Sequence, residues 1–88
     1  MVINKSCIVR STAGRDKGRA FVVLDVVDGQ YALLADGRMR RLEKPKRKKL
    51  KHLVFESDNR TRLGEKIEKG EKLTNAEIRR TLADHQKI

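Results

Sequence analysis

Residues 11–18, Ser-Thr-Ala-Gly-Arg-Asp-Lys-Gly, join two short apolar runs at residues 7–9 and 21–24. The runs are rich in β-branched residues and too short to be read as helices, which favours strands. Gly14 and Gly18 stand on either side of Arg-Asp-Lys, and glycines at this spacing are typical of tight loops. The stretch therefore predicts two strands joined by a loop with a charged tip, where binding residues concentrate.

Further strands follow closely through the first two thirds of the chain. Their predicted positions are residues 7–9, 20–27, 30–35, 38–43 and 50–55. Asp28-Gly29 and Asp36-Gly37 supply turn signals between successive strands. Pro45 is expected to end the fourth strand, because proline cannot donate to a β-ladder. Residues 46–49, Lys-Arg-Lys-Lys, are then expected to form a solvated connection to the fifth strand.

Residues 20–27 carry an almost continuous apolar run. A flat sheet would leave one apolar face in water, so the run predicts a strongly bent strand that serves both halves of a small closed barrel. The chain has 88 residues, which suits one small domain. The expected fold is mainly β, with a barrel of about five strands at residues 1–56 and a helical extension at residues 57–88.

The last third of the chain predicts one or two α-helices. Thr-Asn-Ala-Glu at 74–77 is a capping box, which predicts a helix over residues 75–86. Leu63 and Ile67 lie one helical turn apart before Gly70, which predicts another helix that ends at this glycine. Both apolar stripes are narrow, so we expect the helices to dock lightly on the barrel or to order fully only against a partner.

The formal net charge is +10, and most of it lies in one segment. Residues 38–52 contain nine basic residues and one acidic residue, a balance of +8. A field so focused suits a polyanion, and arginine forks suit bidentate contact with phosphates. Phe21, Tyr31 and Phe55 are the only aromatic rings, too few for a base-stacking platform. Membrane binding is disfavoured because no apolar face accompanies the lysines, and a plain solvated face is the remaining alternative.

Other site types find no support in the residue spacing. Lys17 precedes the second glycine and a strand follows, which excludes a phosphate-binding P-loop. Cys7, His52 and His85 lack metal-ligand spacing, and we expect them to be buried, part of the basic face and exposed, respectively. No nucleophile and base are arranged together, and no signal peptide or membrane span is visible. We expect no catalysis, cofactor, metal or small-molecule substrate, and a cytoplasmic location.

The strand–loop–strand arrangement around Gly18 resembles a KOW motif. The loop at 11–18, the turn Ala-Asp-Gly-Arg at 35–38 and the segment Arg-Leu-Glu-Lys-Pro-Lys at 41–46 resemble small bacterial KOW-domain RNA-binding proteins. That family is similar to the large-subunit ribosomal protein fourteen of archaea and eukaryotes. The resemblance covers about residues 6–54. It implies an SH3-like barrel that binds structured, usually ribosomal, RNA through its first loop and adjacent basic residues.

The resemblance assigns RNA contact to Arg15, Lys17 and Arg19, and the charge pattern extends the contact along the basic segment. The full expected set is Arg15, Lys17, Arg19, Arg38, Arg40, Arg41, Lys44, Lys46, Arg47, Lys48, Lys49 and Lys51. The expected partner is RNA, foremost ribosomal RNA, with ribosomal proteins as further neighbours. Two alternatives stay open. One is a KOW protein-interaction module of the transcription or translation machinery that docks through its helices, and the other is a DNA-binding protein.

Overall fold

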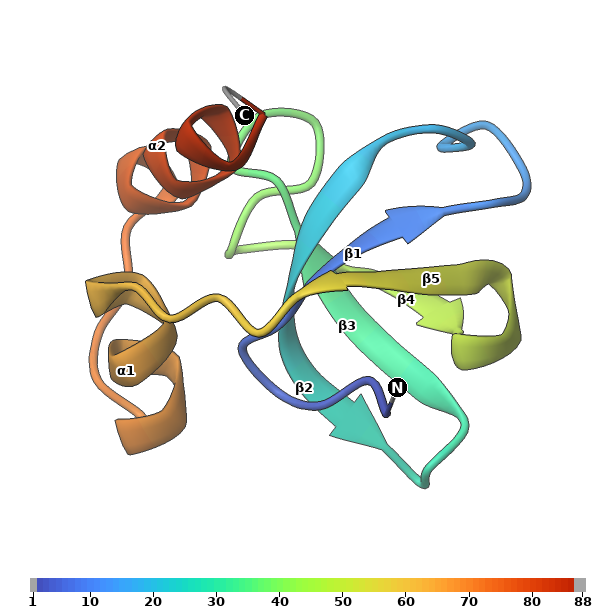
Figure 1. Ribbon diagram of the computed structural model, residues 1–88, viewed down its shortest axis with the longest axis horizontal. Helices are drawn as coiled ribbons and strands as arrows, with labels where there is room; N and C mark the ends of the chain where they lie inside the picture. Colours follow the sequence, from blue (N-terminus) through green and yellow to red (C-terminus); the bar gives the residue numbers. More distant parts are fainter. Residues whose placement is uncertain (1, 87–88) are drawn as a thin grey trace.

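The computed structural model describes residues 2–86 and has the architecture of a small, barrel-like β domain with two C-terminal helices. In chain order the elements are β1 (Ile8–Ser11), β2 (Ala20–Val27), β3 (Tyr31–Ala35), β4 (Lys46–Lys49), the 3-10 helix η1 (Leu50–His52), β5 (Leu53–Ser57), α1 (Arg62–Lys69) and α2 (Asn75–His85). The five strands form one antiparallel sheet in the order β4-β3-β2-β1-β5, which curls as Figure 1 shows. The predicted fold class is confirmed.

Strand β2 is apolar on both sides because the sheet is covered on both faces. Phe21 and Val23 point into the barrel, where they pack with residues of β1 and β3. Ala20 and Val22 point to the opposite face, where they pack against Ile78 and other residues of the helices. Burial of both faces accounts for the apolar run over residues 20–23. The register of β2 against β3 also shifts between Val23 and Asp25, and strands bend at such irregularities, in agreement with the bent strand that the sequence predicts.

The two helices are part of the core, which corrects the expectation that they dock lightly. Leu63 and Ile67 of α1, together with Ile78 and Leu82 of α2, are buried in one cluster with the outer face of the sheet. Each apolar stripe is narrow, but the two stripes meet over the same patch. The capping box before α2 is present as predicted, and α1 ends at Gly70 as predicted.

The fourth strand lies later in the chain than the sequence predicts. Residues 38–43 contain no strand, and Met39 stands 72% exposed in a turn. The carboxylate of Asp36 shapes this turn by accepting hydrogen bonds from the backbone amides of Arg38 and Arg40, each at 2.9 Å. Strand β4 is instead the Lys-Arg-Lys-Lys segment, so Pro45 precedes the strand rather than ending it. The prediction of a solvated connection at this segment is wrong.

Strand β5 forms the edge of the sheet next to β1, with which it pairs antiparallel. Its register places Leu53 beside Ser11, and the amide of Thr12 donates to the carbonyl of His52 at 2.9 Å. The fifth strand therefore begins later than residues 50–55 predict. Residues 50–52 form the 3-10 helix η1, and β5 starts at Leu53. None of the helices within residues 2–86 has both the length and the apolarity needed to cross a membrane.

Candidate nucleic-acid interface

The loop between β1 and β2 is tied to the barrel at its base and at its centre. The amide of Gly18 donates to the carbonyl of Ser11 at 2.8 Å. The guanidinium of Arg10 donates to the carbonyl of Gly18 at 2.7 Å and also holds both carboxylate oxygens of Glu56. Asp16, between them in the chain, is buried. The loop therefore has a fixed shape, which spares ordering cost when it meets a partner.

The three basic side chains that the resemblance assigns to this loop and its exit all face solvent. Arg15, Lys17 and Arg19 are exposed. Because their neighbours in the loop are held by backbone bonds, these side chains project from a defined position toward any approaching anion.

Two other predicted residues hold the loop in place. The ammonium of Lys48 on β4 donates to the carbonyl of Ala13 at 2.7 Å. The guanidinium of Arg40 lies 3.5 Å from the carboxylate of Asp16. Its Nε atom is buried without a hydrogen-bond partner among the described residues. These contacts join the loop to β4 on one side and to the turn after β3 on the other, so part of the basic segment supports the loop.

The basic side chains of β4 alternate between the two faces of the strand. Lys46 and Lys48 are half-buried, and they pair in register with Leu34 and Ala32, which point into the barrel. Arg47 points outward and lies over the ring of Tyr31, 4.3 Å from its centroid, a cation–π contact. Lysines that point inward on an edge strand discourage pairing with another chain. Strand β4 is therefore a charged edge that carries positive side chains on both faces.

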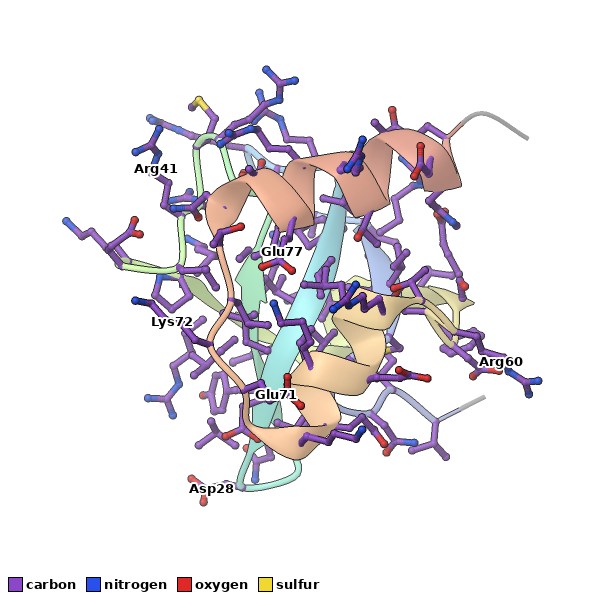
Figure 2. The ribbon with its side chains drawn as sticks, turned by 90° about the vertical axis from the view of Figure 1, so that its left-hand side faces the viewer. Asp28, Arg41, Arg60, Glu71, Lys72 and Glu77 are labelled. Carbon is purple, nitrogen blue, oxygen red and sulfur yellow. The ribbon has the colours of Figure 1, made fainter. Side chains whose placement is uncertain are left out.

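Four arginines from three segments line one hollow at the edge of the barrel. They are Arg19 before β2, Arg38 and Arg41 in the turn after β3, and Arg79 on α2. The hollow has a volume of about 730 Å³ and is open to solvent. In Figure 1 the turn lies beside α2, and Figure 2 shows Arg41 pointing away from the body, on the side opposite to Arg60.

Arg79 also lines this hollow, although the charge pattern of the sequence did not predict it as a contact residue. It lies outside the basic segment, within a helix whose charges nearly balance. Its guanidinium donates to the carbonyl of Gly37 at 2.7 Å. The capping box predicted α2 itself, but nothing in the sequence placed α2 beside the turn.

The remaining predicted residues lie elsewhere along the basic segment. Lys44 is exposed in the turn that precedes β4. Lys49 and Lys51 line a separate hollow with Gln30 beside the β2–β3 turn. The predicted set therefore does not form one compact patch, but a band that runs from the β1–β2 loop and the turn after β3 across β4 to the β2–β3 turn.

Charge compensation separates this band from the rest of the molecule. Within residues 2–86, most carboxylates that form ion pairs do so with basic residues outside the band. These pairs are Arg10 with Glu56, Arg60 with Asp58, Lys66 with Glu77 and His85 with Glu56. Of the predicted contact residues, Arg40 alone has a carboxylate within 4.0 Å in the described part of the chain. The positive charge of the band is therefore little offset by neighbouring carboxylates among the described residues.

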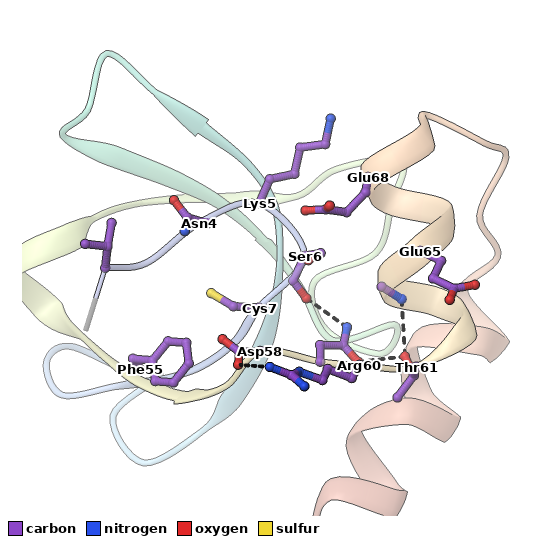
Figure 3. Close-up of a pocket in the computed structure, with 13 residues that line it drawn as sticks. Asn4, Lys5, Ser6, Cys7, Phe55, Asp58, Arg60, Thr61, Glu65 and Glu68 are labelled. Carbon is purple, nitrogen blue, oxygen red and sulfur yellow. Dashed lines mark hydrogen bonds and ion pairs between the residues drawn. The ribbon is translucent and has the colours of Figure 1, made fainter.

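A second hollow, of about 460 Å³, lies between the N-terminal segment and α1 (Figure 3). Its lining mixes acidic side chains, Glu65 and Glu68 among them, with Lys5 and Arg60. Among its lining residues, the side-chain amide Nδ2 of Asn59 donates to the carbonyl of Ser6 at 2.8 Å. The mixed charges give no preference for a polyanion, and the polar contacts join β5 to the body of the domain.

The cysteine and the histidines do not form a reactive centre. Cys7 is buried as predicted, and burial raises the pKa of its thiol, which keeps it protonated and unreactive. His85 is half-buried rather than exposed as expected, because its Nε2 atom lies 2.8 Å from a carboxylate oxygen of Glu56. Residues 2–86 contain no group of three or more His, Cys, Asp or Glu side chains suited to a metal ion.

No protein-family model and no curated protein sequence matches this chain.

Proposed function

We propose that this chain is a non-catalytic RNA-binding protein that grips the phosphate backbone of structured RNA in association with the ribosome or its assembly. The observation that carries the proposal is the band of basic side chains on the loop, the turn and β4: apart from Arg40, none of them has a carboxylate within 4.0 Å among residues 2–86. Clustered arginines and lysines without internal partners gain free energy when they displace counterions from a polyanion. Guanidinium groups add bidentate contact with phosphate oxygens.

The disposition of the aromatic rings favours recognition through the backbone. Phe21 is fully buried, Phe55 packs against the barrel core, and Tyr31 lies beneath Arg47. Without an exposed ring platform, a stretch of single-stranded bases gains little from stacking. A folded RNA instead presents a regular array of phosphates, and proteins recognise such RNA mostly by shape and by backbone contacts.

The assignment to ribosomal RNA and to a cytoplasmic location rests on the resemblance to small KOW-domain proteins and on the charge pattern. A protein-docking role for the C-terminal helices has less support, because their apolar stripes are buried against the sheet. DNA is the alternative polyanion, and competition between duplex RNA and duplex DNA at matched salt separates the two.

Neutralising the loop tests the proposal against a charge-matched control. The test variant carries Arg15→Gln and Lys17→Gln, and the control carries Arg60→Gln and Arg62→Gln. All four residues are exposed, so neither change disturbs the core. We expect the test variant to weaken binding to an RNA hairpin irrespective of its sequence and to reduce the salt slope by roughly 1.5, since each phosphate contact contributes about 0.7–0.9. Equal losses in the two variants would contradict a localised binding surface.

A further inference from the structure

The arginine-lined hollow adjoins a smaller hollow with a different lining. The smaller one measures about 270 Å³ and shares Arg19, Arg38 and Arg79 with the larger one. Its other walls include Ala20 from β2 and Leu82 from α2. Three arginines thus stand at the boundary between a cationic space and a partly apolar one.

Three apolar residues, Ala20, Leu82 and Ala83, line one part of the smaller hollow, here called its floor. Ala20 and Leu82 are buried core residues, and Ala83 lies beside them on α2. Two polar residues also line the smaller hollow: Gln86, which has a side-chain amide, and Asp36, which has a carboxylate. The amide can both donate and accept, whereas an ionised carboxylate only accepts. This combination suits a planar heterocycle with an exocyclic amino group.

The larger hollow suits a phosphate. Four arginines, Arg19, Arg38, Arg41 and Arg79, are among the residues that line it. The only carboxylate among the lining residues of the two hollows is that of Asp36, and its Oδ1 atom already accepts two backbone amides of the turn. Arginine is the side chain best matched to phosphate geometry.

The turn after β3 and α2, which together carry three of the four arginines of this double hollow, are packed closely on each other. Gly37 packs so closely on α2 that an added Cβ would lie 2.4 Å from the carbonyl oxygen of Asn75. The side-chain oxygen of Asn75 also accepts a hydrogen bond from the backbone amide of Leu42 at 2.9 Å. The guanidinium of Arg79 donates a hydrogen bond to the carbonyl of Gly37. The backbone that carries these arginines therefore loses little conformational entropy when the site is occupied.

We propose that the double hollow holds one unpaired nucleotide of the bound RNA, with its phosphate among the four arginines and its base over the apolar floor. The proposal rests on the proposed function and sharpens it, since a base inside a stacked duplex cannot reach the floor, whereas a bulged base is free to leave the helix. The carboxylate of Asp36 makes a base with an amino group the better occupant, so adenine is favoured over uracil.

The test compares RNA hairpins that differ by a single bulged nucleotide. Fluorescence anisotropy measures the affinity of the full chain for a fully paired hairpin, for the same hairpin with a bulged adenosine, and for one with a bulged uridine. We expect the adenosine bulge to bind about tenfold more tightly than the paired hairpin, from one buried apolar contact and one hydrogen bond. We expect the uridine bulge to gain less.

Ala83→Phe fills the floor of the hollow without changing any charge. Ala83 is exposed on α2, so the larger side chain does not enter the core. Ala76→Phe is the matched control, because Ala76 is also exposed on α2 and does not line the hollows. We expect the first variant to lose the preference for the bulge and the second to keep it. Ala83→Leu, with thermal unfolding of each variant, provides a smaller obstruction should phenylalanine disturb the fold.

The outcomes distinguish the two proposals. Equal affinity for paired and bulged hairpins overturns the nucleotide site but leaves RNA binding in place. A bulge preference that survives both Ala83 substitutions also overturns the site. Absence of affinity for every hairpin overturns the proposed function itself, and the nucleotide site with it.

Discussion

Replacing Gly37 by alanine tests whether the turn that carries Arg38 is locked onto α2. Gly37 has φ of 78°, a left-handed conformation that costs an L-residue about 1–2 kcal/mol. An added Cβ would also lie 2.4 Å from the carbonyl oxygen of Asn75 and 2.8 Å from Cγ of Arg79. Relieving such contacts by moving packed elements costs a further 1–3 kcal/mol or so. The expected loss of unfolding free energy is therefore about 2–5 kcal/mol.

Gly29→Ala provides the matched control for this substitution. Gly29 has φ of 66°, but an added Cβ would meet no atom within 4 Å. Gly29→Ala therefore carries the same cost of placing an L-residue at positive φ as Gly37→Ala, but not the cost of a steric clash. Thermal unfolding measures both variants, and a difference of about 2 kcal/mol corresponds to roughly 8–16 °C in Tm for a domain of this size. Equal destabilisation by the two substitutions would refute the close packing of the turn on α2.

Two further substitutions test the core and the network at the base of the loop. Ile78→Ala is expected to cost about 2–5 kcal/mol, because Ile78 is fully buried between sheet and helices, and a loss below 1 kcal/mol in urea unfolding would show that α2 docks only lightly. The pKa of Glu56 is lowered, first by its hydrogen bond with Arg10 and also by His85, so its stabilising contribution is complete above the unfolded value near 4.3 and is lost as pH falls through the folded value. Glu56→Gln is thus expected to cost about 2 kcal/mol at pH 7 and much less at pH 3, and an equal cost at both pH values would contradict this linkage.

Local signals in the sequence predicted the elements that depend on local chemistry. Asp28-Gly29 adopts positive φ at both positions, as the hairpin signal implies. The Thr74–Glu77 capping box starts α2, and Gly70 closes α1. In each case the residues that decide the structure lie within one turn of chain, so their pattern carries the information.

The position of the fourth strand could not be predicted from the local sequence, because it depends on pairing with β3. Lys46–Lys49 has low strand propensity and no apolar alternation, yet it pairs with β3 along its whole length. Residues 38–43 alternate partly, but Asp36 bends them into a turn. The same reason explains why Arg79 was missed at the candidate site, since only the packing of α2 beside that turn brings it to the other arginines.

The salt dependence of RNA binding tests the central claim most directly. The full chain is titrated with a structured RNA at several salt concentrations, and the logarithm of the association constant is plotted against the logarithm of the salt concentration. If the basic band neutralises about four phosphates, the slope will be roughly −3 to −4. A slope near zero, or no binding at low salt, would contradict the account.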